Sequence, residues 1–232
     1  MQNSSKIVVL KIIEGLQPKS ILDVPSGDGW LVKNLNPSIS IDGIDLFQSK
    51  NKLYRKWKSL DLNEGIPDGF GKYDCIISCE GLEHFGNPER FLSSDNSCLN
   101  DKGTLLISTP NIWYPRSRFQ YMLRGFFPSF PCLIGKINRG DHMHIIPWSF
   151  PQLYLFLKLS GFSKIALHPE LLSEPKYFYD KLLGLPQYIY CQRKVTKSKS
   201  IEEKMFWEMA ASKESLHGRH LIITALKEGV KF

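Results

Sequence analysis

Ile21-Leu22-Asp23-Val24-Pro25-Ser26-Gly27-Asp28-Gly29 is the stretch of sequence that decides the fold. An apolar, β-rich run ends at Asp23 and Val24 and passes directly into a turn that carries two glycines. Glycine adopts backbone angles closed to other residues, and the helix that follows such a turn presents free N–H groups. A strand, a glycine turn and a helix in this order predict a site for a nucleotide-like ligand.

Two other phosphate-binding loops are disfavoured by the residues that follow. A dinucleotide fingerprint needs a further glycine at the third position after Gly29, where this chain has Val32. A P-loop would carry Gly-Lys-Ser or Gly-Lys-Thr, and the sequence contains neither. The sequence therefore argues against a site for NAD or FAD and against a P-loop nucleotide site.

Length and composition indicate one intracellular domain. The chain has 232 residues, 42% of them hydrophobic, which is enough for a single substantial core. Its five cysteines are odd in number and scattered, so no disulfide framework is indicated and a reducing cytosol fits best. The first apolar run is short and interrupted by Lys11, which predicts neither a signal peptide nor a spanning helix. We expect a cytoplasmic protein that can also sit at the periphery of a membrane.

The net charge of +7 and the isoelectric point near 9.1 permit an anionic partner. RNA, a nucleotide-sugar and a phospholipid-linked substrate all satisfy this condition, and so does a solvated basic surface with no partner. The densest basic run lies at 193–199 and contains no aromatic residue, which favours a solvated linker over a nucleic-acid site.

The order of the elements predicts an α/β fold. Short β-rich runs alternate with helical patterns, as a parallel sheet covered by helices on both faces requires. Asn87 and Pro88 give a helix start signal, and Trp148 to Pro151 opens a later helix that Gly161 ends. We expect strands near 20–24, 40–45, 57–61, 73–78, 103–109, 162–168 and 218–226, and helices near 6–16, 29–35, 88–99 and 148–160.

Two segments interrupt this alternation. Residues 111–147 are rich in aromatic, basic, Gly and Pro residues without a sustained period, which predicts an active-site lid. Residues 170–217 form an insertion ahead of the last strand, and its second half is expected to be helical after a capping box at Ser200 to Glu203. Lid, insertion and sheet together make one domain over 1–232.

Acidic and histidine residues gather at the end of the strand near 73–78. In Glu80-Gly81-Leu82-Glu83-His84, positions 80, 83 and 84 share one face of a helical turn. Asp141-His142-Met143-His144 later places two more histidines on one side of an extended segment. Carboxylate oxygen and imidazole nitrogen suit Mg, Mn, Fe or Zn, so a divalent-metal site is a hypothesis, beside a plain capping role for the Glu-His pair.

The glycine loop resembles the first motif of the class I S-adenosylmethionine-dependent methyltransferases, an acidic residue followed by alternating glycines. Ile44-Asp45-Leu46 is similar to the segment that binds the cofactor's ribose in that family, and Leu60-Asp61-Leu62 to the segment that contacts the adenine. The resemblance implies a Rossmann-like fold with a seven-stranded, mostly parallel sheet whose last strand is antiparallel. The cofactor-binding residues that it implies are Asp23, Pro25, Ser26, Gly27, Asp28, Gly29, Asp45, Leu46, Asp61, Leu62 and Glu80.

The Glu80-x-x-Glu83-His84 string and His144, four residues before Trp148, resemble the small-RNA 2′-O-methyltransferases that modify a 3′-terminal ribose. That resemblance implies a metal held by Glu80, Glu83, His84 and His144 on the 2′- and 3′-hydroxyls. The same elements resemble the ubiquinone-pathway O-methyltransferases and the methyltransferases of bacterial surface-glycan synthesis. Ile145-Ile146-Pro147 departs from the aromatic and acidic residues that the RNA enzymes favour, so the sequence favours a sugar diol over RNA.

These motifs predict an S-adenosylmethionine-dependent O-methyltransferase of polysaccharide biosynthesis, with a glycan or glycolipid-type acceptor that can be phosphate- or lipid-linked. Candidate proton acceptors are His84, His142 and His144. A terminal-ribose RNA enzyme, a small-molecule O-methyltransferase and a cofactor-binding scaffold without catalysis remain as alternatives. In a further alternative, Glu80 only orders the cofactor loop and His84 alone is the base.

Overall fold

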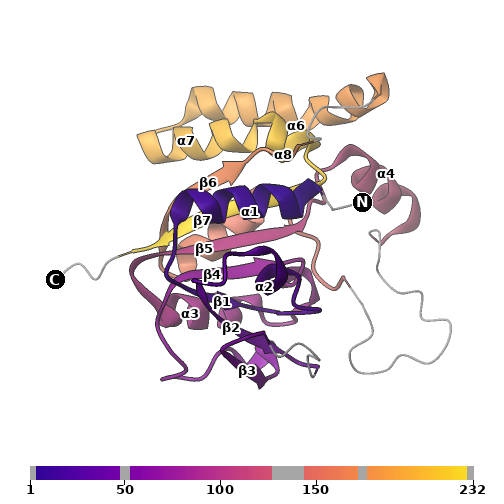
Figure 1. The fold of residues 1–232 in the computed structure, drawn as a ribbon. Coiled ribbons are helices and arrows are strands. Elements are labelled where there is room, and N and C mark those ends of the chain that lie inside the picture. Colours follow the sequence, from indigo (N-terminus) through magenta and orange to yellow (C-terminus); the bar gives the residue numbers. More distant parts are fainter. Residues whose placement is uncertain (1–3, 48–52, 127–143, 172–176, 229–232) are drawn as a thin grey trace.

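A computed structural model describes residues 4–47, 53–126, 144–171 and 177–228. Seven strands form one sheet in the order β3-β2-β1-β4-β5-β7-β6 (Figure 1). All neighbouring strands from β3 to β5 run parallel, whereas β7 is antiparallel to both β5 and β6. The strands are β1 Ser20–Asp23, β2 Ser40–Asp45, β3 Lys56–Ser59, β4 Tyr73–Cys79, β5 Leu99–Pro110, β6 Phe162–His168 and β7 His220–Lys227. The Rossmann-like fold and the antiparallel last strand expected from the sequence are confirmed.

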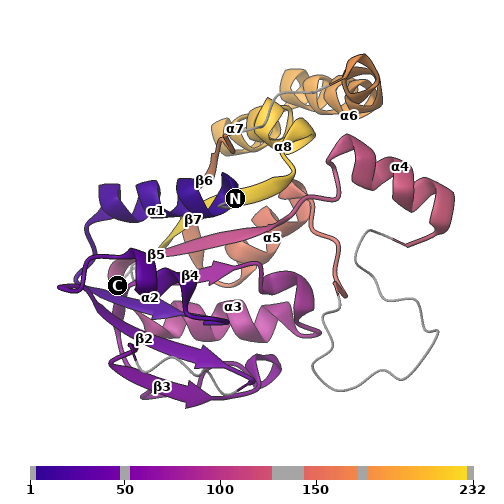
Figure 2. The same cartoon turned by 45° about the vertical axis from the view of Figure 1, so that its right-hand side comes forward.

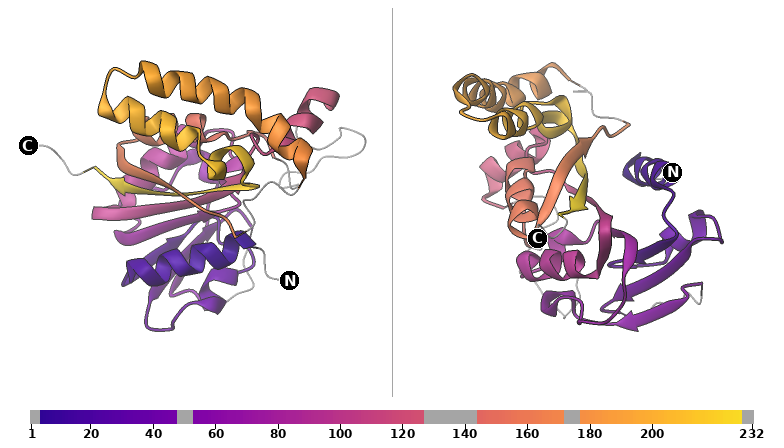
Figure 3. Two further views of the ribbon diagram at one scale, coloured as in Figure 1. Left: turned by 90° about the horizontal axis from the view of Figure 1, so that it is seen from above. Right: turned by 90° about the vertical axis from the view of Figure 1, so that its left-hand side faces the viewer.

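Helices cover both faces of this sheet, because successive strand residues point to opposite sides. Ile21 and Ile77 belong to a core cluster beneath α1 and α2, and their neighbours Leu22 and Ile76 belong to a second cluster beneath α3 and α5. α1 and α5 accordingly lie on opposite sides of the strands (Figures 2 and 3). The α-helices are α1 Ser4–Leu16, α2 Trp30–Asn34, α3 Pro88–Cys98, α4 Pro115–Arg124, α5 Phe150–Leu159, α6 Phe178–Lys197, α7 Ile201–Ala210 and α8 Lys213–His217, and the short 3-10 helices are η1 Leu62–Glu64 and η2 Leu82–His84.

The predicted start signals act as expected. Asn87 caps α3 by accepting a hydrogen bond from the N–H of Arg90, with Pro88 in the first turn. Ser200 caps α7 by accepting from the N–H of Glu203. The return bond of the expected box differs by one residue, since the Glu203 carboxylate accepts from the N–H of Lys199.

Within the segment 111–147, where a lid was expected, α4 forms with Pro115 in its first turn and Gly125 at its left-handed end. Two other expectations about local structure were wrong. The basic run at 193–199 is not a linker, because α6 continues through Lys197 and buries Cys191 on the way. The third strand ends at Ser59 rather than 61, since Asp61 caps η1.

Helices α6, α7 and α8 form a layer of their own beside β6 and β7 (Figure 1). These three helices fall within residues 170–217, where an insertion was expected. Phe206 and Trp207 of α7 pack on the core cluster, and Phe206 stacks on Phe150 of α5. The layer is therefore fastened to the sheet from its α7 side, which leaves one side of α6 facing outward.

Candidate functional site

The loop after β1 is tied to the end of β2. The N–H of Gly27 donates to Oδ2 of Asp45 at 2.7 Å, and the N–H of Ser26 donates to the carbonyl of Ile44. Gly27 and Gly29 both have positive φ, 49° and 71°, which other residues adopt only with strain. The sequence-predicted loop and ribose-binding carboxylate therefore lie against one another at the carboxyl edge of the sheet, where such folds bind ligands.

Asp23 lies beneath this loop and is fully buried. The hydroxyl of Tyr54 donates to its Oδ2 at 2.6 Å, while Oδ1 has no hydrogen-bond partner among the described residues. Burial raises the pKa of Asp23 to about 7 against the opposing effect of the Tyr54 hydrogen bond. Tyr54 was missed at the sequence level, because a tyrosine in a loop between strands carries no motif.

The other residues expected to bind the cofactor differ in their solvent exposure. Ser26 is buried and accepts from the indole N–H of Trp57, and Leu62 is buried in the core, so its side chain faces away from solvent. Asp61 accepts from the N–H of Asn63 in its capping role. Asp28 is exposed, and Pro25 and Leu46 are half-buried.

Pro25 links this loop to the acidic segment after β4. The Val24-Pro25 peptide is cis, and the pyrrolidine ring lies against Gly81 so closely that a Cβ on Gly81 would meet Cδ of Pro25 at 2.2 Å. Glycine is therefore required at position 81 for steric reasons. Its place between the two loops puts the cofactor loop next to the candidate metal ligands.

Glu83, His84 and His144 form the tightest group of possible metal ligands in the described ranges, with one ligand atom of each within 4.8 Å of the others. Nε2 of His84 lies 3.8 Å, and Nε2 of His144 lies 4.0 Å, from Oε1 of Glu83. The main-chain N–H groups of Ile145 and Ile146 both donate to the carbonyl of Glu83. These bonds bring His144 to the η2 turn, although 60 residues lie between Glu83 and His144 in the sequence.

Glu83 is nearly inaccessible, with 1% of its surface exposed. Its Oε2 accepts from the hydroxyl of Thr109 at 2.8 Å, and its Oε1 has no hydrogen-bond partner among the described residues. Burial, together with the charge of Glu80, raises the pKa of Glu83 to about 8. A cation beside this buried carboxyl group would strongly stabilise its ionised form.

Glu80 lies apart from this group. The expected shared helical face does not form, because Glu80 has a positive φ of 52° and precedes the η2 turn. Its Oε1 accepts from the hydroxyl of Ser108 at 3.1 Å, and its Oε2 lies 3.6 Å from Nε2 of His220. The structure thus brings together three of the four expected ligands. His142, the other expected histidine, lies outside the described residues.

His220 and Glu170 belong to the site and were missed at the sequence level. Nδ1 of His220 lies 2.9 Å from Oε1 of Glu170, whose Oε2 accepts from the N–H groups of Arg219 and His220. Burial by itself lowers the pKa of His220, but the hydrogen bond to Glu170 and the charge of Glu80 raise it above its ordinary value. The signal was present in the topology, because an antiparallel last strand begins at the edge where the parallel strands end.

A cavity of about 470 Å³ joins these groups. Its lining comes from the end of β5, the start of β7 and one side of α4. α4 stands at that edge of the sheet (Figure 2). A volume of this size is ordinary for a small-molecule site. The lining residues that the chemistry uses are Glu80, Glu83, His144, His220, Arg116 and Arg219.

The model of the family described as "Methyltransferase domain" matches residues 8–163 of the chain. The chain belongs to this methyltransferase family. The matched region carries the sheet from β1 to β5, the glycine loop and the Glu83-His84-His144 group. A search of curated protein sequences finds no match.

Solved structures with a similar fold include several methyltransferases. A S-adenosylmethionine-dependent methyltransferase from Archaeoglobus fulgidus is 16% identical with a TM-score of 0.55, over 96% of this chain and 94% of that one. A 1,6-didemethyltoxoflavin-N1-methyltransferase from Burkholderia thailandensis, solved with 1,6-didemethyltoxoflavin and S-adenosylhomocysteine, is 14% identical with a TM-score of 0.54, over 97% of this chain and 79% of that one. The CurJ carbon methyltransferase is 16% identical with a TM-score of 0.52, over 98% of this chain, which spans 54% of that one. The family match identifies the chain as a methyltransferase, and the similar structures, which share its fold, include carbon- and nitrogen-methylating enzymes.

Proposed function

We propose that this methyltransferase methylates a hydroxyl of a sugar diol on a glycan or glycolipid-type acceptor, with a divalent cation held by Glu83, His84 and His144. The observation that supports the proposal most is the convergence of these three ligand atoms within 4.8 Å of one another, with Glu83 and His144 lining the acceptor cavity. The cofactor would lie over the glycine loop with Asp45 at its ribose, as the family resemblance implies.

The donor set fits a divalent cation. It offers one carboxylate oxygen and two imidazole nitrogens, and the Glu83 oxygen that faces both rings has no hydrogen-bond partner in the described ranges. A buried polar atom left in this way costs free energy unless a ligand pairs with it. Two imidazoles with one carboxylate suit Mn, Fe or Zn better than Mg, which prefers oxygen ligands.

The chain's own residues account for alignment and proton removal. S-adenosylmethionine supplies a methyl group activated by sulfonium, so that the new O–C bond forms as the C–S bond breaks. A divalent cation held by Glu83, His84 and His144 would lower the pKa of an acceptor hydroxyl beside it. His220 is the candidate that accepts the hydroxyl proton on Nε2, because Glu170 holds its Nδ1 and the ring lines the cavity. Correct placement of the two reacting groups contributes roughly 7–11 kcal/mol.

Arg116 and Arg219 line the same cavity and favour an anionic group near the diol. A glycosyl phosphate carries such a group. The 3′-terminal ribose of RNA carries both a diol and a phosphate, and this makes it the second candidate acceptor. The Lys and Arg residues of α6 do not line the cavity. They therefore do not extend the cavity into a basic groove for RNA, and the sugar acceptor stays the first candidate.

One experiment separates these functions. Metal-stripped protein is incubated with S-adenosylmethionine, Mn²⁺ and one acceptor at a time: a methyl glycoside, a glycosyl phosphate, an RNA with a free 3′-terminal diol, and catechol. Mass spectrometry should detect a methyl group on the sugar acceptors that disappears with chelator or with a 2-deoxy analogue. Methylation of RNA alone would favour the second candidate, and methylation that is insensitive to chelator would contradict the metal site.

A further inference from the structure

Helix α6 carries an apolar stripe that faces solvent instead of the core. Phe178, Leu182, Leu185 and Ile189 follow one another at spacings of four, three and four residues, which places them on one side of a helix. Their exposed fractions are 83%, 60%, 45% and 40%. A surface helix normally turns such a stripe inward, and here the inward side holds Gly184 and Cys191 instead. The stripe is therefore available for a partner.

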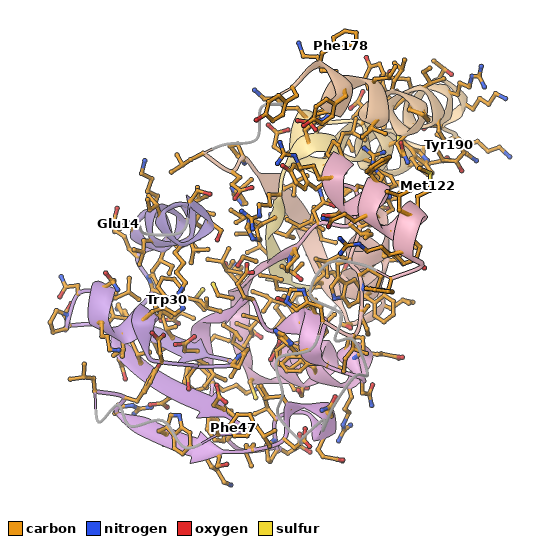
Figure 4. All side chains as sticks on the ribbon, turned by 90° about the vertical axis from the view of Figure 1, so that its right-hand side faces the viewer. Glu14, Trp30, Phe47, Met122, Phe178 and Tyr190 are labelled. Carbon is orange, nitrogen blue, oxygen red and sulfur yellow. The ribbon has the colours of Figure 1, made fainter. Side chains whose placement is uncertain are left out.

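Helix α4 extends this apolar surface. Phe119, Tyr121, Met122 and Leu123 are exposed there, Met122 and Leu123 to 70% and 66%. α4 packs beside α6, and Met122, Phe178 and Tyr190 lie at one end of the molecule, far from Glu14, Trp30 and Phe47 (Figure 4). Single exposed apolar residues are normal on a protein surface, but an apolar surface spread over two neighbouring helices is typical of an interaction site.

The rim of this surface is basic and rich in tyrosine. Tyr179, Tyr188 and Tyr190 are exposed on α6, and Lys181, Arg193 and Lys197 are exposed beside the stripe. Tyrosine favours the boundary between hydrocarbon and water, and Lys and Arg pair with lipid phosphates. The basic rim would also repel a second copy of the same surface, which disfavours a symmetric dimer through α6.

The apolar surface connects with the acceptor cavity. A second hollow of about 580 Å³ lies between α4 and α6, lined by Phe119, Tyr179, Leu182 and Leu183 together with Arg116 and Gln120. Arg116 and Gln120 also line the acceptor cavity, so the two hollows share a wall. A hydrocarbon chain in the second hollow would place its polar head beside Arg116.

We propose that the α4–α6 surface, defined by the exposed residues of these two helices, docks onto an anionic lipid bilayer. α6 lies in the headgroup region with its apolar stripe toward the acyl chains, as interfacial amphipathic helices do. No helix in the described part of the chain is long and apolar enough to cross a bilayer. Docking would open the acceptor cavity toward lipid-linked acceptors; this last step rests on the proposed function, whereas the docking itself does not.

Vesicle sedimentation tests the docking. The full-length protein is mixed with vesicles of phosphatidylcholine and phosphatidylglycerol at 7:3, and with vesicles of phosphatidylcholine alone. We expect cosedimentation with the anionic vesicles that weakens in high salt. A double variant, Phe178→Ser with Ile189→Ser, should bind at least about tenfold more weakly. Arg193→Gln should weaken binding about fivefold, which is the effect of one cation near an anionic surface.

Leu159→Ser is the matched control, because Leu159 of α5 is 79% exposed and lies outside the α4–α6 surface. It should bind like the wild type, and all variants should keep the cofactor affinity measured by calorimetry, which confirms folding. A wild type that fails to sediment, or a double variant that sediments equally, would overturn the proposal. A dimer in size-exclusion chromatography that the double variant dissociates would instead assign the surface to a second copy. Failure of docking would leave methyl transfer to soluble acceptors unaffected, so the two proposals fail separately.

Discussion

The N–H of Gly27 donates to Oδ2 of Asp45 at 2.7 Å, so the glycine loop after β1 is fastened to the carboxylate at the end of β2. Oδ1 of the same carboxylate accepts from the N–H of Phe47. One side chain therefore organises both loops at which the cofactor is expected. This arrangement makes Asp45 a structural support as well as a candidate ligand for the ribose.

Asp45→Ala should weaken S-adenosylmethionine binding more than the loss of ribose contacts alone would. Hydrogen bonds to a charged group contribute about 1.5–3 kcal/mol each, and the variant also releases the Gly27 N–H. Asp45→Asn keeps one acceptor oxygen, so its affinity for S-adenosylmethionine should lie between that of Asp45→Ala and that of the wild type. Calorimetric titration measures both affinities. Equal affinity in all three proteins would remove Asp45 from the cofactor site.

Gly81→Ala should destabilise the protein by about 1–3 kcal/mol through overpacking. The new Cβ would meet Cδ of Pro25 at 2.2 Å, and a proline ring cannot rotate away. Gly15→Ala is the control, because nothing lies within 4 Å of its Cβ position and alanine favours the helix there. Urea denaturation of both variants compares the effects. A Gly81→Ala protein as stable as the control would contradict the close packing of the two loops.

The sequence predicted the sheet better than the site, for a physical reason. Buried strands such as Cys75 to Ser78 can be predicted from their apolar composition. The family resemblance predicted that the last strand is antiparallel. The site depends on contacts between distant segments. Glu170 and His220 carry no local motif. The register of β7 on β5, with His220 opposite Pro110, brings His220 to the cavity, and Glu170 lies behind it as its hydrogen-bond partner.

Glu80 shows the opposite failure. Its spacing from Glu83 and His84 is right for a helical turn, but the chain leaves β4 with a positive φ at Glu80 and enters the η2 turn only afterwards. A spacing rule assumes regular backbone, and a single left-handed residue turns the side chain to Ser108 and His220 instead. His144 does lie beside Glu83, because the main-chain N–H groups of Ile145 and Ile146 donate to the Glu83 carbonyl; its role as a ligand stays a prediction.

Asp23→Asn should flatten the pH dependence of stability between about pH 4 and 7. The folded carboxyl has its pKa raised from 3.8 to about 7 by burial, so in this window the unfolded chain loses a proton that the folded chain keeps. Wild-type stability therefore falls as pH rises through the window, with a slope of at most about 1.4 kcal/mol per pH unit from this group. Asparagine cannot titrate and removes that slope.

Urea denaturation at several pH values measures the effect, and the difference between the two profiles isolates Asp23. Asp74→Asn is the control, because hydrogen bonds from Asn100 and the β1 backbone lower the pKa of Asp74 although burial opposes this. The lowered pKa predicts the opposite sign, a stabilisation that is lost as pH falls. Parallel profiles for wild type and Asp23→Asn would show that Asp23 is already ionised in the folded protein.

Glu83→Gln should abolish binding of the divalent cation and reduce methyl transfer at least about 100-fold while S-adenosylmethionine affinity is kept. The amide still fills the space and can accept from Thr109, so the fold should survive. Glu80→Gln is the comparison, since Glu80 lies outside the group of ligands and should keep the cation. Elemental analysis after soaking in Mn²⁺ or Zn²⁺ gives the stoichiometry. A Glu83→Gln protein that retains one cation, or a wild type that binds none and stays fully active, would end the metal hypothesis.

His220→Gln should lower kcat about 100-fold or more with little change in KM, because a general base acts in the transition state. Glu170→Gln acts through His220, so it should lower kcat by a smaller factor. It should also shift the acidic limb of the pH–rate profile to lower pH, since the Glu170 carboxylate raises the pKa of His220. His168→Gln is the control: His168 on β6 contacts Thr224 rather than the cavity and should leave the rate unchanged. A pH–rate profile that Glu170→Gln does not move would assign proton removal to another group and leave His220 a structural partner of Glu170.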